Sequence, residues 1–237
     1  MKTKNPYYSI IEKLRNKIIV SCQASANEPF YADECMIAMV KSVIIGGAGA
    51  LRLAGARHIK AVKSISGLPV IGITKPEVIP DNYKEIVYIT PAFEDAKSIR
   101  DAGCDIIAID STERKRPREN LKELIDLIHN KLQCPVMADI STYEEGINSE
   151  KYGVDIISTT LAGYTTYSNT SIGPDFELLK DLVNKVNVPV ILEGRIESVE
   201  HVKKAFDLGA YAVVIGSAIT RPHLITKKFV NMVQNYD

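Results

Sequence analysis

Two residues of opposite charge, each at the end of an apolar run, are the first candidates for chemistry. Lys75 follows PVIGIT, and Glu193 follows PVIL. An ionised side chain in such a stretch is costly unless an opposite charge or hydrogen bonds relieve it. Opposite charges that meet would relieve the cost for both. Their placement therefore predicts that the fold brings Lys75 and Glu193 to one polar site.

Two glycine-containing stretches near the C-terminus have the composition of an anion site. EGR contains Gly194, and GSAITR begins with Gly216 and Ser217 and ends with Arg221. Backbone N–H groups at glycines can approach an anion closely, and an arginine can hold a phosphate through two hydrogen bonds. Close packing of a helix on a sheet is the alternative explanation for the glycines. Two such stretches beside an arginine favour phosphate binding.

The elements that must position these residues are predicted from apolar runs that alternate with helical patterns. Apolar residues at helical spacing predict helices over 121–132 and 176–186, and a short helix in an N-terminal extension over 1–16. Eight βα units in 237 residues are typical of an α/β protein with a single (β/α)8 TIM barrel, here one domain over 1–237. An open doubly wound sheet is the alternative, but no G-x-G-x-x-G follows the first run. The eight predicted strands are 17–23, 50–54, 69–75, 105–110, 135–140, 155–161, 189–193 and 211–216.

A ninth apolar stretch, EIVYIT over 85–90, also has the composition of a strand. Only nine residues separate it from Lys75, and a parallel crossover with its helix needs roughly 10–12. Predicted strands entered through Pro-Val alternate with strands entered through a glycine that ends the preceding helix. The alternation holds only without EIVYIT. We therefore predict that this stretch is an excursion in a loop, outside the ring of strands.

Polar residues end every predicted strand, and the carboxyl ends of barrel strands meet at one mouth, where active sites lie. A solvated strand end or a helix cap would explain some of these residues, such as Asp110. The run ERKRPRE over 113–119 is interpreted as a solvated face, with an oligomer contact as the alternative. The residues at the eight ends are Gln23, Arg52, Lys75, Asp110, Asp139, Thr159 with Thr160, Glu193, and Gly216 with Ser217.

The composition argues against several classes of partner. Lys and Arg number 29, as do Asp and Glu, so no net charge favours nucleic acid or an anionic membrane. No run approaches the ~18 apolar residues of a membrane span, and the N-terminus lacks the features of a signal peptide, so we expect a soluble, cytoplasmic protein. The four cysteines form no C-x-x-C pair and the four histidines lack ligand spacing, so we expect free thiols and no metal.

Seven motifs, in order along the chain, resemble one enzyme family. Together they are similar to the N-acetylmannosamine-6-phosphate 2-epimerases, and the resemblance runs from about Lys17 to Phe229. Each motif alone is weakly specific, whereas the set is highly specific. The motifs are SCQA at 21–24, ALRLAG around Arg52, VIGITK ending at Lys75, MADIST at 137–142, TTLAGYT at 159–165, EGRI at 193–196 and GSAITRP at 216–222.

The resemblance implies that the protein interconverts N-acetylmannosamine 6-phosphate and N-acetylglucosamine 6-phosphate, in the breakdown of sialic acid and amino sugars. The proton on C2, next to the C1 aldehyde of the open-chain sugar, is removed and returned to the other face, so no cofactor is implied. Lys75 is the implied base, Glu193 relays or holds the proton, and Arg52 stabilises the oxyanion. A homodimer is also implied.

The same resemblance assigns the remaining residues of the predicted site. Those implied to bind the sugar, besides Arg52, are Gln23, Asp139, Thr160, Gly163 and Tyr164. Those implied to bind the phosphate are Gly194, Arg195 through its backbone, Gly216, Ser217 and Arg221. Two other functions stay open at this point. A Schiff-base aldolase or synthase would use Lys75 as a nucleophile, and a non-catalytic sugar-phosphate sensor would have little use for both Lys75 and Glu193.

Overall fold

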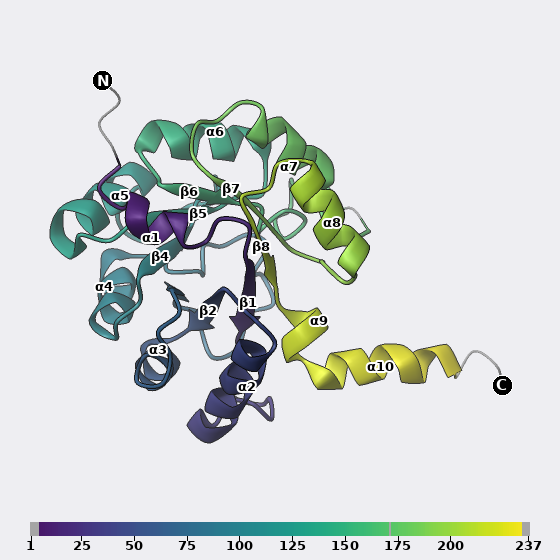
Figure 1. Cartoon of the computed structure of the whole chain (residues 1–237). Coiled ribbons are helices and arrows are strands. Elements are labelled where there is room, and N and C mark those ends of the chain that lie inside the picture. Colours follow the sequence, from purple (N-terminus) through teal and green to yellow (C-terminus); the bar gives the residue numbers. More distant parts are fainter. Residues whose placement is uncertain (1–4, 171, 234–237) are drawn as a thin grey trace.

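Eight parallel strands close into a barrel, each paired with the next along the chain and β8 paired with β1 (Figure 1). The computed structural model describes residues 5–170 and 172–233, so both ends of the predicted domain and residues 1–4 of the predicted extension lie outside the described residues. The predicted TIM barrel is confirmed. The strands are β1 Ile18–Cys22, β2 Ala50–Ala54, β3 Val70–Ile73, β4 Ile106–Asp110, β5 Val136–Asp139, β6 Ile156–Ser158, β7 Val190–Glu193 and β8 Ala212–Ile215.

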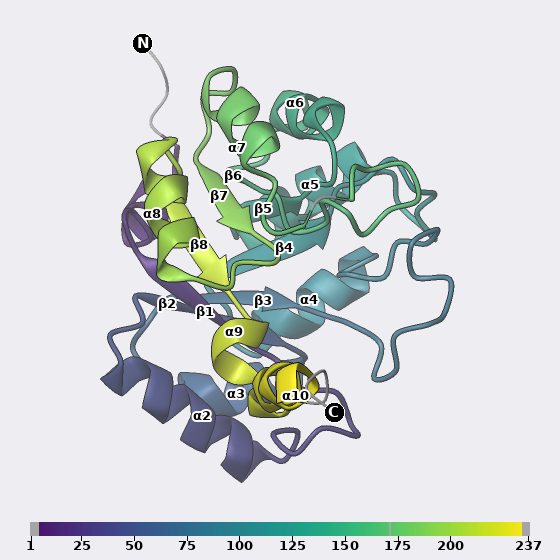
Figure 2. The same cartoon turned by 90° about the vertical axis from the view of Figure 1, so that its right-hand side faces the viewer.

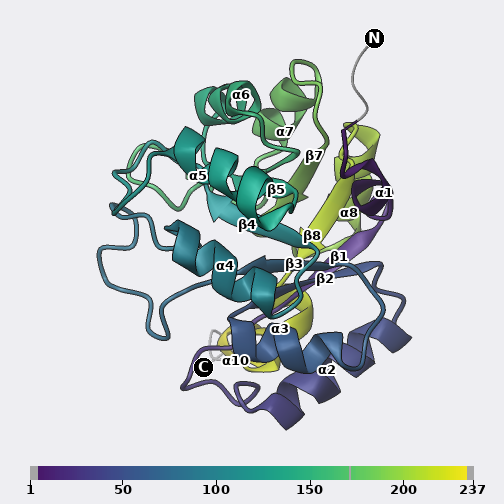
Figure 3. The ribbon, with the colours of Figure 1, turned by 90° about the vertical axis from the view of Figure 1, so that its left-hand side faces the viewer.

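Helices surround the barrel (Figure 2 and Figure 3). The predicted helix 121–132 begins at a capping box of Asn120 with Glu123 and runs as α5 into a π-helical segment. The helix predicted over 176–186 ends at Val183. The helices that cover the barrel are α2 Asp33–Ile45, α3 Ala56–Lys63, α4 Phe93–Asp101, α5 Leu121–Leu127 with η1 Ile128–Leu132, α6 Tyr143–Tyr152, α7 Phe176–Val183 and α8 Val199–Asp207. Two more follow β8, namely α9 Ser217–Thr220 and α10 Pro222–Val233.

Side chains fill the barrel interior and a short helix closes one end of it. Successive residues of β1 point to opposite faces, so Ile19 belongs to the inner cluster and Val20 to the outer layer under the helices. Helix α1, Tyr8–Glu12, crosses the end where the strands begin and adds Ile11 to the inner cluster, and the turn after it adds Leu14 (Figure 1). The predicted N-terminal helix is thereby confirmed, and the opposite mouth is left for a site.

The stretch 85–90 lies outside the ring, as predicted, because β3 pairs directly with β4. It crosses the gap where these two strands end. The Thr90 amide donates to the Thr74 carbonyl, and the Asp110 amide donates to the Ile89 carbonyl. Val87 and Ile89 are buried, which explains why the stretch has the composition of a strand.

Candidate active site

A cavity of about 450 Å³ opens at the carboxyl ends of the strands. It receives Lys75 from the loop after β3 and Glu193 from the end of β7, on opposite sides of the eight-stranded ring. The other predicted residues that line it are Gln23, Thr160, Tyr164, Gly194, Arg195, Gly216, Ser217 and Arg221. Arg52, Asp139 and Gly163 are not among the residues that line it.

Arg52 lies beneath the cavity between two carboxylates. It is 1% exposed, and both of its terminal nitrogens contact the fully buried Asp139, with 3.0 Å between Nη1 and Oδ1. The same Nη1 donates to Oε2 of Glu193 at 3.0 Å. Burial works against the guanidinium charge, but the two carboxylates outweigh it and keep the pKa of Arg52 above its ordinary value. Arg52 therefore ties β2 to β5 and β7 and holds the Glu193 carboxyl in place.

Two threonines of the β6 end complete the support of Glu193. The Thr160 hydroxyl lies 2.7 Å from Asp139 Oδ1 and 3.0 Å from Glu193 Oε2. The Thr159 hydroxyl accepts from the Glu193 amide and donates to its carbonyl. Burial raises the pKa of Glu193, and this effect exceeds the opposing attraction of Arg52. Glu193 is thus a fixed carboxyl group that holds a proton more readily than an ordinary glutamate.

Lys75 has a lowered pKa and no direct partner in the described parts of the chain. Surrounding protein atoms displace water from its ammonium group and Arg52 repels it, so the pKa of Lys75 falls to about 8, although Glu193 and Asp139 act in the opposite direction. Lys75 is nevertheless exposed to the open cavity. A bound sugar that excludes solvent from the cavity would lower the pKa of Lys75 further. With a pKa of about 8, roughly a tenth of Lys75 is neutral at pH 7, far more than for an ordinary lysine.

Two glycines, Gly194 and Gly216, lie on the β7–β8 side of the cavity. Gly194 and Arg195 both adopt positive φ, at 108° and 54°, so two consecutive residues turn sharply as the chain leaves β7. The Arg195 guanidinium is engaged with backbone carbonyls. Its Nε donates to the Gly173 carbonyl at 2.7 Å and its Nη1 donates to the Ala162 carbonyl at 2.6 Å. That Arg195 binds phosphate through its backbone stays a prediction.

The residues after β8 add further groups to that side. Gly216 precedes α9, and its carbonyl accepts from the Thr220 amide at 3.0 Å. Arg221 follows α9 and lies 3.4 Å from a carboxylate oxygen of Glu28. Gly163 lies under Arg195, since a Cβ added to Gly163 would meet Nη1 of that arginine at 2.6 Å. Gly163 therefore permits the close approach of the Arg195 side chain.

An aromatic and apolar wall on the β3–β4 side was missed by the sequence reasoning. Tyr83, Tyr88 and Ile89 line the cavity from the loop after β3, and Leu161 faces them from the loop after β6. The available signal was the excursion EIVYIT itself, because a loop between two barrel strands at their carboxyl ends must lie at the mouth.

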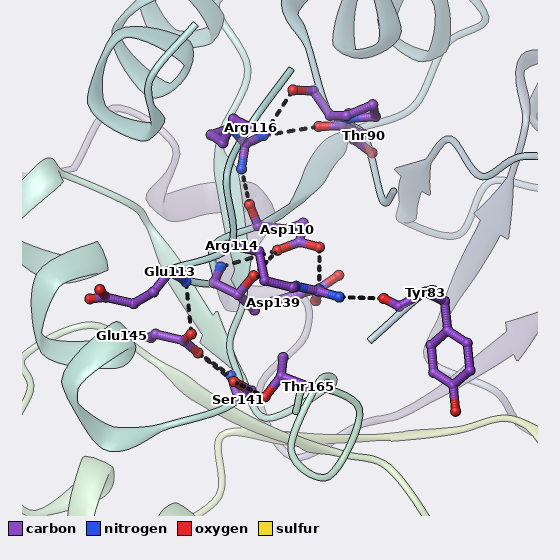
Figure 4. A network of polar contacts seen from close by, with 12 residues as sticks. Tyr83, Thr90, Asp110, Glu113, Arg114, Arg116, Asp139, Ser141, Glu145 and Thr165 are labelled. Atoms are coloured by element: carbon purple, nitrogen blue, oxygen red, sulfur yellow. Dashed lines mark hydrogen bonds and ion pairs between the residues drawn. The ribbon is translucent and has the colours of Figure 1, made fainter. Parts of the chain in front are cut away.

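The interpretation of 113–119 as a solvated face is wrong for its first two arginines. Arg114 is 7% exposed and pairs with Asp110 at 2.6 Å, and Arg116 donates to the carbonyls of Asp110 and Pro91 (Figure 4). Asp110 is correspondingly more than an exposed strand end. Burial raises the pKa of Asp110, although Arg114 opposes that rise. The sequence could not show this burial, because some of the carbonyls that accept from the arginines, those of Tyr83 and Pro91, belong to a distant segment of the chain.

Within residues 5–170 and 172–233 no group of three or more His, Cys, Asp or Glu side chains is arranged to hold a metal ion. No helix in the same ranges combines the length and the apolar character needed to cross a membrane.

Fold and cavity together define a (β/α)8-barrel protein whose polar site lies at the carboxyl ends of its strands. A family model described as "Putative N-acetylmannosamine-6-phosphate epimerase" matches residues 36–235. The chain therefore belongs to this epimerase family, as the motifs predicted.

Individual relatives agree with the family assignment. Proteins named "Putative N-acetylmannosamine-6-phosphate 2-epimerase" from Clostridium perfringens and Caldanaerobacter subterraneus subsp. tengcongensis are 47% and 49% identical, each over 95% of this chain and over 100% and 94% of the relative. A solved structure of the N-acetylmannosamine-6-phosphate 2-epimerase from Clostridium perfringens superposes with a TM-score of 0.89. It is 44% identical, with 98% of this chain and 100% of that chain covered.

Proposed function

We propose that this enzyme interconverts N-acetylmannosamine 6-phosphate and N-acetylglucosamine 6-phosphate by proton transfer at C2. The observation that carries the proposal is the pair Lys75 and Glu193, which line one cavity from opposite sides of the ring. The pKa of Lys75 is lowered to about 8 and the pKa of Glu193 is raised, so the difference between the two pKa values is smaller than for ordinary side chains. Pairs with such environments are suited to general acid–base catalysis.

The proposed reaction begins with the open-chain sugar, in which the C1 carbonyl acidifies the C2 proton. Neutral Lys75 removes this proton and becomes an ammonium, and the electron pair moves into an enolate whose oxygen on C1 carries the charge. Glu193 gives its proton to the opposite face of C2 and becomes a carboxylate. The ammonium and the carboxylate then exchange a proton, directly or through water in the cavity. None of these steps requires a cofactor.

Arg52 and Asp139 act in this proposal through other groups. Arg52 stays charged beneath the cavity and supplies a fixed positive field that favours the developing oxyanion and lowers the pKa of Lys75. Asp139 holds Arg52 by two contacts. Gln23, whose Nε2 donates to Ser21 Oγ at 2.7 Å, lines the cavity with Thr160 and Tyr164 and is left to orient the sugar hydroxyl groups.

The phosphate is assigned to the β7–β8 side of the cavity. Gly194, Arg195, Gly216 and Ser217 line this side, and we assign their backbone N–H groups to the phosphate oxygens, with Arg221 as the cation. Arg221 is only about one-third exposed and has a neighbouring carboxylate on Glu28, so its guanidinium is already held near the place where a phosphate would bind.

The test is to incubate the purified protein with N-acetylmannosamine 6-phosphate and to follow N-acetylglucosamine 6-phosphate by NMR. Wild type should convert each of the two sugar phosphates into the other, and Lys75→Ala should convert neither. Borohydride treatment provides a second readout. A protein that forms no product, or one in which borohydride traps a covalent adduct of the sugar with Lys75 during turnover, would contradict the proposal.

The enzyme is further proposed to act as a cytoplasmic homodimer, with no nucleic-acid or membrane partner. Balanced charges, 29 basic and 29 acidic, support the last point. Helix α10 supports the dimer, because it extends from the barrel without a buried residue and exposes Phe229, Met232 and Val233 (Figure 1). An apolar cavity of about 570 Å³ between β1, α2 and the start of α10, lined by Met39 and Val43 among others, is available for such a helix.

Light scattering on the purified protein tests the dimer. Wild type should have twice the monomer mass, and Phe229→Glu should weaken association because it places a charge in the proposed apolar contact. Val199→Glu, at an exposed apolar position on α8, is the control and should remain dimeric. A monomeric wild type at micromolar concentration would contradict this part of the proposal.

A further inference from the structure

The wall formed by 83–90 is the part of the cavity that the proton-transfer chemistry leaves unused. Tyr83, Tyr88 and Ile89 come from this stretch, and Leu161 and Tyr164 face the same cavity from the loop after β6. Together these residues give an apolar and aromatic surface with hydroxyl groups. Such a surface matches a small acyl group, with a methyl end and one carbonyl oxygen, better than it matches a phosphate or a bare polyol.

The position of the wall agrees with where the C2 substituent of the substrate must lie. The phosphate on C6 is assigned to the β7–β8 side, and C2 must lie within reach of Lys75 and Glu193. In an open-chain sugar C2 stands four carbons from C6, so its substituent extends away from the phosphate. The wall lies over β3 and β4, since Ile89 and Thr90 are hydrogen bonded to the ends of those strands. In the closed ring these strands are opposite β7 and β8.

Tyr88 is the residue of the wall best placed to recognise a ligand. Its ring is partly buried and is held between the ring of Tyr83, 6.4 Å away in an edge-to-face arrangement, and the guanidinium of Arg114, 5.8 Å from its centroid. Its hydroxyl has no hydrogen-bond partner in the described parts of the chain. Burial raises the pKa of Tyr88 to about 12, so this hydroxyl remains a donor at any physiological pH.

Two arginines fix the wall at its two ends. Arg114 donates to the Tyr83 carbonyl at 2.6 Å while it pairs with Asp110 at 2.6 Å. Arg116 donates to the Pro91 carbonyl at 3.1 Å and contacts the Asp110 carbonyl. Figure 4 shows both arginines directed from the β4 end toward these carbonyls. The wall is therefore held in one conformation before any ligand binds, which is how a rigid specificity surface is built.

We propose that the wall 83–90 receives the 2-acylamino group of the sugar phosphate, with Tyr88 as a specificity-determining residue and Arg114 as the positioning residue that holds the wall. The inference rests on the proposed function. The Tyr88 ring packs against the acyl chain and limits its length, and the Tyr88 hydroxyl donates to the acyl carbonyl. Arg114 touches no substrate atom in this proposal and acts through Tyr83 and Tyr88.

The test compares two substrates that differ only in acyl length, N-acetyl- and N-butanoyl-mannosamine 6-phosphate. For Tyr88→Ala we expect kcat/KM for the acetyl substrate to fall and the butanoyl-to-acetyl ratio of kcat/KM to rise at least about tenfold, since one methylene in a pocket discriminates by ~10–200-fold. Tyr88→Phe should keep the wild-type ratio and raise KM several-fold for both. Tyr152→Ala, on the outer helix α6, is the matched control and should match wild type.

The same ratio tests the positioning role of Arg114. Arg114→Lys retains a charge near Asp110 but cannot also reach the Tyr83 carbonyl as a guanidinium does. It should therefore shift the acyl ratio in the direction of Tyr88→Ala, while inhibition by inorganic phosphate stays unchanged. If Arg114 had a purely structural role, Arg114→Lys would lower kcat/KM equally for both substrates. Arg114→Lys combined with Tyr88→Ala should shift the ratio no further than Tyr88→Ala alone.

The two variants test the wall and the positioning role separately. A wild-type ratio in folded Tyr88→Ala would overturn the assignment of the wall, even if overall activity fell. A wild-type ratio in folded Arg114→Lys would overturn the positioning role alone. If wild-type protein did not epimerise the acetyl substrate at all, the proposed function would fail, and this inference with it.

Discussion

Two glycine-containing turns lie on the β7–β8 side of the cavity, whereas the β3–β4 side carries side chains held by buried arginines. At β7 the chain turns through Gly194 and Arg195 in the left-handed region, and the groups it offers are amides. At β3 and β4 the wall 83–90 is held by Arg114 and Arg116, whose partners are carbonyls and a buried carboxylate. Lys75 lies on the β3–β4 side of the cavity, and the carboxyl group of Glu193 lies on the β7–β8 side.

One cavity can thus bind the phosphate on one side and carry out proton transfer on the other. A doubly charged phosphate is bound by many oriented N–H dipoles and needs no particular proton. Proton transfer and acyl recognition instead need side chains with set pKa values and set positions, and these require neighbours to hold them. Changes on the β7–β8 side should therefore act mainly on KM, and changes on the β3 side mainly on kcat and selectivity.

The largest expected effect is on the catalytic side. Lys75→Ala should lower kcat by at least about 10²–10⁴-fold, the usual contribution of a general base, with phosphate-dependent binding retained. Lys75→Arg should fail as well, because a guanidinium does not deprotonate at working pH. NMR assays of turnover and calorimetric titration of ligand binding measure the two quantities. Lys41→Ala, on the exposed surface of α2, is the control, and a folded Lys75→Ala with near-wild-type kcat would remove Lys75 from the mechanism.

On the anchoring side, Arg221→Ala should raise KM about 10–100-fold with a smaller change in kcat, because a charge-assisted hydrogen bond contributes ~1.5–3 kcal/mol. The unphosphorylated sugar should be a poor substrate for both forms. Steady-state kinetics with each sugar provide the measurement, and Arg57→Ala, in a surface ion pair on α3, is the control. Equal use of both sugars by wild type would break the distinction between the two sides.

The pH dependence should report the catalytic side alone. The pKa of Lys75, about 8, lies below its ordinary 10.5, and only the neutral amine is a base. With the substrate phosphate fully ionised, kcat/KM should rise nearly tenfold per unit of pH below 8 and level off above it. Stopped assays across the range test this, and a flat profile from pH 6 to 9 would contradict a lysine base.

The smallest expected effect concerns the loop that supports Arg195. Gly163→Ala places a methyl group 2.6 Å from Nη1 of Arg195 at a φ of 83°, so the guanidinium must shift and the Gly194–Arg195 turn with it. We expect KM to rise about two- to fivefold, given strain of ~1 kcal/mol. Gly153→Ala has a similar φ of 93° and nothing within 4 Å, so it should change stability and leave KM unaltered. Identical KM values for the two variants would show that Gly163 does not support the anchor.

Much of the fold and half of the site followed from local patterns. The strands of a parallel barrel are covered on both faces, so they read as uninterrupted apolar runs, and every predicted run contains an observed strand. Because all carboxyl ends meet at one mouth, knowing the strand ends was enough to place Lys75, Glu193, Gln23 and Gly216 around one cavity. The exclusion of 85–90 followed from chain length, since a crossover does not fit.

Other features depend on contacts between residues far apart in the chain. The sequence determined the barrel, the polar mouth and the two charges that face it, because periodicity, strand length and topology are local or topological properties. Only the tertiary structure decided that Arg52 lies beneath the cavity, shared by Asp139 and Glu193, and that Arg114 is buried against Tyr83. The physical reason is that burial and pKa are set by which distant groups surround a side chain, and a run such as ERKRPRE has the same composition whether water or carbonyl oxygens solvate its arginines.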